Sequence, residues 1–215
     1  MNKQSFKHLS YPLAVCALAV LLGACATTKL QNTWKAPDCP QPVGKIAVLA
    51  IEERGLVREG FENRLVRLLK KTDAPAVVTY DLLSLPDIKE NKQAAAERFR
   101  ATGAQTVLIM RLAGSGGSYH ESRAGNERYA ATVTGIESMG WYDYYSVGFV
   151  DMGVTYGNTK QVVYIEVGLY DLNTEKRLWY GQTQTVLKEG VDRVSEMEPL
   201  VKKFVAAMRK DGVVR

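Results

Sequence analysis

Three short apolar runs separated by helical patterns constrain the fold of this chain most. The runs lie at Lys45–Ile51, Ala76–Tyr80 and Gln105–Leu112, and such aliphatic runs are typical of strands buried on both faces. Between them, Val57–Lys71 and Asp87–Gly103 carry apolar side chains at helical spacing, the second beginning with a capping pattern. Because strand, helix, strand, helix, strand is the order of parallel strands joined by crossovers, the sequence predicts a three-stranded βαβαβ core.

The last third of the chain predicts an antiparallel hairpin and a helix. Val162–Asp171 alternates between apolar and polar side chains, and Arg177–Leu187 follows after a turn at Leu172–Lys176. This pattern indicates a hairpin that is covered on one face. The final helix is expected to begin between Ser195 and Pro199, because the first suits a capping box and the second suits position N1. The fold class is therefore α/β (α+β), with a hairpin and a carboxy-terminal helix added to the core.

Residues 113–161 interrupt this order with a connection far longer than compact domains usually contain. It opens on Gly114–Ser118, which lacks the Lys-Ser/Thr pair of a phosphate loop and is expected to act as a hinge. Tyr144–Tyr156 alternates as a β-arm does. The insertion either folds back onto its own domain or binds a partner through aromatic side chains with polar tips. The candidate partner-binding residues are Trp141, Tyr142, Tyr144, Tyr145 and Phe149.

The amino-terminal residues have the features of a bacterial secretion signal. A basic start is followed by the apolar run Leu13–Leu22, and Gly23 and Ala24 supply the small residues of a cleavage site. The sequence Leu22-Gly23-Ala24-Cys25 resembles the lipobox of bacterial lipoproteins, in which the cysteine is diacylated, exposed by cleavage and acylated on its new amine. This resemblance implies lipidation of Cys25, and two or three acyl chains hold a domain stably at a membrane.

We therefore expect three parts in the chain: a signal peptide at 1–24, a lipid-anchored tether at 25–44, and a single α/β domain at 45–215. The apolar run falls short of the ~20 residues that a transmembrane helix needs. Ala26 follows the cysteine in place of Asp, which in many Gram-negative lipoproteins implies the outer membrane, here at its periplasmic face. Trp34 either docks the tether on the domain or rests near lipid headgroups.

Cys39 is expected to be the only unmodified thiol of the mature chain, because Cys16 leaves with the signal and Cys25 is acylated. It lies in the proline-rich segment Ala36–Pro42, which should be extended and accessible. We interpret it as an inert thiol, with intermolecular pairing as the alternative.

Composition and charge exclude some partners. Hydrophobic residues form 46% of the chain, enough for one core, and the net charge of +5 falls when Lys3 and Lys7 leave with the signal. An exported chain of such modest charge is not expected to bind nucleic acid.

No constellation of catalytic residues is present in the sequence. His120 is the only histidine after the signal, and its neighbours Ser118 and Glu121 have no fixed mutual geometry in a glycine-rich stretch. One histidine cannot build a typical zinc site, and no nucleophile elbow is present. We expect no catalytic activity, no metal and no cofactor.

Three segments carry a resemblance to a known group: Lys45–Leu49, Thr102–Leu108 and Leu169–Trp179. With the order of elements, they resemble bacterial outer-membrane lipoproteins whose domain is similar to the amino-terminal domain of TolB and to the core of the curli secretion lipoprotein. The resemblance covers about residues 45–211 and implies a binding or assembly role in the envelope. No catalytic residue belongs to its motif.

Together these features predict a non-enzymatic, lipid-anchored periplasmic module that binds an envelope protein through the aromatic insertion. The alternative is a subunit of an oligomeric outer-membrane secretion pore. The first expectation also leaves room for a homo-oligomer, and in both the acyl chains contact the membrane.

Overall fold

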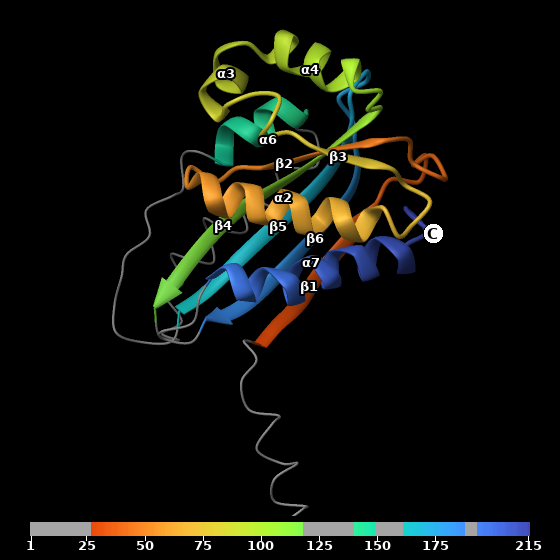
Figure 1. The fold of residues 1–215 in the computed structure, drawn as a ribbon. Coiled ribbons are helices and arrows are strands. Elements are labelled where there is room, and N and C mark those ends of the chain that lie inside the picture. Colours follow the sequence, from red (N-terminus) through yellow and green to blue (C-terminus); the bar gives the residue numbers. More distant parts are fainter. Residues whose placement is uncertain (1–26, 118–139, 149–160, 188–192) are drawn as a thin grey trace, which may run out of the picture.

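The computed structural model describes residues 27–117, 140–148, 161–187 and 193–215, which form a mixed sheet with helices on both faces (Figure 1). The strands are β1 (Thr27–Lys35), β2 (Ile46–Ala50), β3 (Ala76–Val78), β4 (Thr106–Gly117), β5 (Gln161–Asp171) and β6 (Arg177–Leu187). The helices are α2 (Gly55–Leu69), α3 (Leu85–Glu90), α4 (Lys92–Ala101), α6 (Trp141–Gly148) and α7 (Arg193–Lys210). Within these ranges, no helix has the length and apolar character needed to span a membrane.

The sheet has the strand order β1-β6-β5-β4-β2-β3. β2 pairs in parallel with both β3 and β4, whereas β4, β5, β6 and β1 pair antiparallel in succession. The α/β class, the parallel core and the antiparallel hairpin are therefore confirmed. β4 joins the parallel and antiparallel halves of the sheet.

Two helical layers cover the sheet. Helices α2 and α7 pack together over one face, where alternate strand residues such as Val48, Leu108 and Trp179 form the larger core. Helices α3, α4 and α6 cover the parallel half of the other face, where Leu49 and Ile109 belong to a second core. Because successive side chains of a strand point to opposite faces, each aliphatic run contributes to both cores.

The predicted tether at 25–44 is wrong where the structure describes it, because Thr27–Lys35 forms an edge strand of the sheet. β1 pairs antiparallel with β6 from Thr27 opposite Val186 to Lys35 opposite Trp179. Its sequence shows no alternation of apolar and polar residues. Its two large apolar side chains, Leu30 and Trp34, are 40% and 38% exposed. Backbone pairing with a long neighbouring strand holds β1, rather than a buried face of its own.

The proline-rich segment after β1 is also packed rather than extended into solvent. The Ala36 amide donates to the Leu178 carbonyl over 2.9 Å. Ala36, Cys39 and Val43 are all buried in the core beneath α7. The expected accessibility of Cys39 is therefore wrong, and burial raises the pKa of its thiol.

The expected insertion at 113–161 is shorter than the sequence indicates. The glycines at its start continue β4, because Gly114–Gly117 pair with Tyr164–Gln161 of β5 after a register shift, so the expected hinge is a paired strand. The predicted β-arm at Tyr144–Tyr156 is wrong over its first part, since Trp141–Gly148 is helix α6. The remainder of that arm lies outside the described residues.

Helix boundaries differ from the sequence pattern at two places. Ser84 caps α3 in place of Asp87, whose carboxylate accepts from the Ser84 amide in a reciprocal capping box. Asn91 then begins a separate helix, α4, because its side chain accepts from the Ala94 amide. At the end of the chain, α7 begins at Arg193, and Pro199 lies inside it instead of near its start.

Candidate functional site

Helix α6 carries most of the sequence-predicted site residues, and it packs into the domain. Trp141, Tyr144 and Tyr145 each have 0% exposure. The Trp141 ring lies 6.1 Å from the Phe99 ring, and the Tyr145 hydroxyl donates to the Leu85 carbonyl over 2.5 Å. Of the two alternatives for the insertion, this part of it folds back onto its own domain.

Tyr142 is the described residue of this group whose side chain reaches the surface. It is half-buried, whereas Phe149, like Cys25, lies outside the described residues. Contact of this group with a partner stays a prediction, and among its described members the side chain of Tyr142 is the one that a partner could reach.

The Tyr142 surface, defined here as Tyr142, Lys89, Lys92 and Glu175, is held in place by polar contacts. The Tyr142 hydroxyl donates to the Lys89 carbonyl over 2.5 Å, and the Lys92 ammonium lies 5.7 Å from the centre of its ring. Lys92 also forms an ion pair with Glu175, which occupies the β5–β6 turn with a positive φ of 60°. The aromatic ring is thus fixed from two sides before any partner arrives.

An open groove lies between α3 and α4. Two of its lining residues, Glu90 and Asn91, lie in the sequence between Lys89 and Lys92 of the Tyr142 surface. Its volume is about 650 Å³. Its walls combine aliphatic side chains with charges of both signs, and the lining residues are Leu82, Leu83, Asp87, Glu90, Asn91, Ala94, Ala95 and Arg98. The pKa of Asp87 is lowered by its hydrogen bonds to Ser84, so this carboxylate is committed to capping α3.

A buried row of polar side chains crosses three strands on the α6 side of the sheet. Arg111 of β4 stands opposite Glu166 of β5, which stands opposite Gln182 of β6. Arg111 Nη2 lies 2.7 Å from Glu166 Oε2, and Gln182 Nε2 donates to Glu166 Oε1 over 3.0 Å. Arg111 is 1% exposed and Glu166 0%, so the charges compensate each other away from water.

Tyr144 joins this row to helix α6. Its ring lies 4.6 Å from the Arg111 guanidinium, and its hydroxyl donates to Glu166 over 3.4 Å. Burial and the Glu166 charge raise the pKa of Tyr144. Burial alone lowers the pKa of Arg111, but Tyr144 and Glu166 raise it beyond its ordinary value. Arg111 therefore stays charged and Tyr144 stays neutral, and the row offers neither a base nor an accessible nucleophile.

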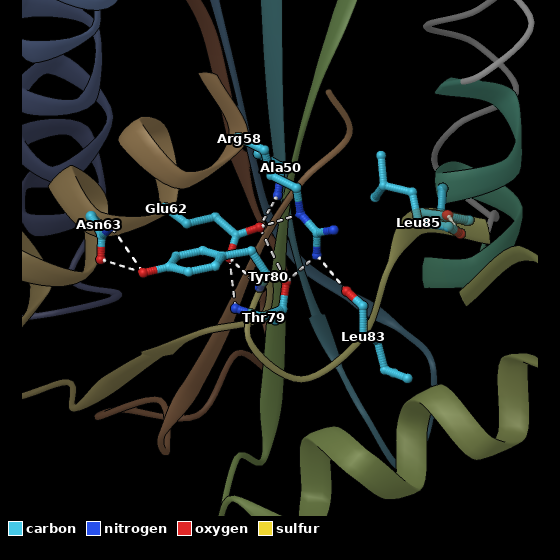
Figure 2. Close-up of polar contacts among 9 residues, drawn as sticks. Ala50, Arg58, Glu62, Asn63, Thr79, Tyr80, Leu83 and Leu85 are labelled. Atoms are coloured by element: carbon cyan, nitrogen blue, oxygen red, sulfur yellow. Dashed lines mark hydrogen bonds and ion pairs between the residues drawn. The ribbon is translucent and has the colours of Figure 1, made fainter. Parts of the chain in front are cut away.

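A second buried network joins α2 to the ends of β2 and β3 (Figure 2). The Glu62 carboxylate accepts from the backbone amides of Ala50, Thr79 and Tyr80 over 3.1, 2.6 and 2.9 Å. Arg58, one turn earlier on α2, donates to Glu62 over 3.0 Å. Burial raises the pKa of Glu62, against the lowering effect of Arg58 and the amides. This network fixes the helix on the sheet and leaves no lone pair free for chemistry.

Arg177, the first residue of β6, lies between two aromatic rings. Its guanidinium is 5.1 Å from the centre of the Trp34 ring and 5.2 Å from that of Tyr180. Of the two alternatives for Trp34, the structure confirms docking on the domain. The cation–π contact fixes the end of β1 against β6.

The sequence does not reveal the buried row of Arg111, Glu166 and Gln182, because none of the three residues departs from the pattern of its own strand in a way that indicates burial. Glu166 and Tyr170 alternate with apolar residues, which predicts a solvent-facing side of the hairpin, yet both are 0% exposed. The prediction that the hairpin is covered on one face only is wrong at these positions. The available signal was Arg111, a cation directly after the apolar run Val107–Met110, because an unpaired charge there would be costly.

Metal and catalytic candidates are few in the described chain. Among the residues with described positions, no group of three His, Cys, Asp or Glu side chains is placed to hold a metal ion. His120, with Ser118 and Glu121, lies outside the described residues.

No protein-family model matches the chain, and no curated protein matches it either. Among solved structures, a PelC dodecamer from Paraburkholderia phytofirmans is similar at 12% identity and a TM-score of 0.46, covering 84% of this chain and 96% of that one. A second crystal form of PelC with one substitution has 12% identity, the same coverage and a TM-score of 0.42.

The lipoprotein GNA1162 from Neisseria meningitidis is similar at 14% identity and a TM-score of 0.39, covering 79% of this chain and 99% of that one. At these values, all three similarities concern the course of the chain alone.

Proposed function

We propose that the protein is a lipid-anchored, non-enzymatic interaction module of the bacterial cell envelope, held at the periplasmic face of the outer membrane through Cys25. The observation that carries this proposal is the sequence Leu22-Gly23-Ala24-Cys25 ending two residues before β1. A cleavage and acylation site placed there leaves every strand of the sheet intact. The mature chain then begins at the anchor and enters the fold at once.

The Tyr142 surface is the proposed contact with an envelope protein. Tyrosine is enriched at interface hot spots, because its ring offers large contact area and its hydroxyl a polar tip. Tyr142 is already held by the Lys89 carbonyl and by the Lys92 ammonium, so a partner need not immobilise it. The groove between α3 and α4 is lined in part by Glu90 and Asn91, which lie in the chain between Lys89 and Lys92.

The arrangement of charges supports binding rather than catalysis. Glu62 and Glu166, which are fully buried, are both paired with arginines inside the domain. Asp87, which lines the groove, caps α3. Among the described groove residues, no nucleophile stands beside a base, which hydrolytic chemistry would require.

In-cell photo-crosslinking tests the partner surface. A photoreactive phenylalanine analogue at Tyr142 is expected to yield a crosslinked species that contains an envelope protein. The matched control places the same residue at Lys202, which is exposed on α7 on the opposite face of the sheet. Crosslinking of the same partner from both positions, or from Lys202 alone, would contradict the proposed contact.

Fractionation tests the anchor separately. The wild-type protein is expected in the membrane fraction, and the Cys25→Ala variant is expected outside it at a comparable level of folded protein. Retention of the Cys25→Ala variant in the membrane fraction would show that something other than the acyl chains holds the domain there.

A further inference from the structure

Four strands share one end of the sheet. Thr27 stands opposite Val186, Val186 opposite Val162, and Val162 opposite Gly116. We call this row the anchor end. Figure 1 shows the start of β1 beside the ends of β4 and β6 at the bottom of the view, with α3 and α4 at the opposite end.

Cys25 is two residues from this row. An extended chain spans at most ~3.6 Å per residue, so Cys25 lies within about 7 Å of Thr27. β1 cannot lengthen this connection, because it is paired with β6 along its whole length from Thr27 to Lys35. The flexible reach that a tether at 25–44 would give is therefore absent from the described part of that segment.

The opposite end of the sheet is far from the row. β5 runs from Val162 at the anchor end to Asp171 before the turn, and at ~3.4 Å per residue this is about 30 Å. A lipid surface at Cys25 can therefore touch one end of the sheet while the β5–β6 turn stands well away from it.

The first residues of β1 suit a lipid surface. Lys29 is exposed, and Leu30 beside it is one of the exposed large apolar side chains, at 40%. The positive charge of a lysine is attracted to anionic lipid headgroups, and the apolar side chain of an exposed leucine costs less to desolvate at the interface than a polar side chain does. β1 contains no acidic residue.

We propose that the anchor end rests on the membrane surface and that the strands stand on it, so that the β5–β6 turn and the Tyr142 surface face away from the lipid. This inference rests on the proposed acylation of Cys25 and adds the orientation of the domain. It assigns the anchor end to lipid, and it assigns the Tyr142 surface to a partner that is reached from the aqueous side.

Depth-dependent fluorescence quenching tests the orientation. In a Cys39→Ser background, single cysteines replace Lys29 near the anchor end or Lys176 in the far turn, both of which are exposed lysines. Each is labelled with an environment-sensitive fluorophore in the purified acylated protein. The protein is reconstituted in phosphatidylethanolamine and phosphatidylglycerol vesicles that carry a headgroup spin label.

The label at Lys29→Cys is expected to be quenched several-fold more than the label at Lys176→Cys. Equal quenching, or stronger quenching at Lys176→Cys, overturns the orientation. A Gly-Ser insertion of about 12 residues before Thr27 gives a reach of about 20 Å and is expected to weaken the difference while acylation persists. If the linker variant keeps the full difference, something other than the short connection orients the domain, and the inference fails.

Mass spectrometry of the same samples separates the two claims. Acylated protein without the quenching difference contradicts only the orientation. Protein found without acyl groups overturns both the orientation and the proposed anchor.

Discussion

Arg111 and Glu166 stand directly opposite each other on β4 and β5, with Arg111 Nη2 2.7 Å from Glu166 Oε2 and both side chains buried. Leaving one buried charge without its partner costs about 3–5 kcal/mol. We expect Glu166→Leu to lower the free energy of unfolding by about that amount. Gln182 also loses an acceptor in this variant. Urea denaturation followed by circular dichroism measures the change.

The double variant Arg111→Met/Glu166→Leu is the control for that experiment. It removes both charges, so it is expected to be more stable than Glu166→Leu alone. Lys29→Met, at an exposed position, should change stability by less than about 0.5 kcal/mol. A double variant less stable than Glu166→Leu would show that the unpaired charge of Arg111 is not the main cause of the stability lost in the single variant.

Gly181 lies under the ring of Trp179. A Cβ at position 181 would meet Trp179 Cη2 at 2.4 Å, which is too close for two carbon atoms. Gly181→Ala is therefore expected to displace the indole and to lose the 2.8 Å hydrogen bond from Trp179 Nε1 to Asp211, at a cost of about 1–3 kcal/mol. Urea denaturation measures the cost, with Gly55→Ala as the matched control, because an added Cβ at position 55 meets nothing within 4 Å. Unchanged stability would contradict the packing of Trp179.

Cys39 is buried at 8% exposure, and burial raises the pKa of its thiol. A protonated thiol is a poor nucleophile. We expect Cys39 to react slowly with a maleimide in the native mature protein and rapidly after unfolding in urea. Native protein that reacts as fast as the unfolded chain, or a reducible dimer that Cys39→Ser abolishes, would contradict the burial of Cys39 and favour the accessible segment that the sequence predicts.

Asp87 carries the pH dependence of the cap on α3. Its hydrogen bonds to Ser84 lower its pKa below the ordinary value of 3.8. The folded pKa is lowered, so the stabilisation is present above the unfolded pKa and is lost as pH falls through the folded value. We expect Ser84→Ala to raise the pKa of Asp87 toward 3.8, as measured by NMR titration. An unchanged pKa in this variant would exclude the reciprocal cap.

The elements that the sequence predicts well are those whose side chains report burial on their own. β2 and β4 are continuous aliphatic runs, and every residue of β2 is buried. Parallel pairing follows from the helices between them. No other element of the chain was needed for those predictions.

The elements that the sequence misses are held by neighbours instead. β1 has its large side chains exposed and depends on pairing with β6. Residues Trp141–Gly148 have the aromatic composition of a strand, yet packing of Trp141, Tyr144 and Tyr145 in the second core holds them as a helix. Propensity is the weaker influence where tertiary contacts are this extensive.

The candidate site, too, could be predicted only in part, because its composition is visible in the sequence and its tertiary contacts are not. Aromatic composition singles out residues 141–145 as candidates, but composition could not tell which rings face inward. Tyr142 differs from Tyr144 only in its position on α6, and that position depends on where the helix meets β4 and α3. The buried partners Arg111 and Glu166 are 55 residues apart in the chain, so their pairing depends on strand register rather than on any local motif.

Intact mass spectrometry of the protein extracted from membranes tests the proposed acylation of Cys25. We expect a chain that begins at Cys25 and carries acyl groups on that residue, so that the anchor leads into β1 after one intervening residue, Ala26. A chain that retains residues 1–24, or that is cleaved elsewhere with Cys25 unmodified, would contradict it.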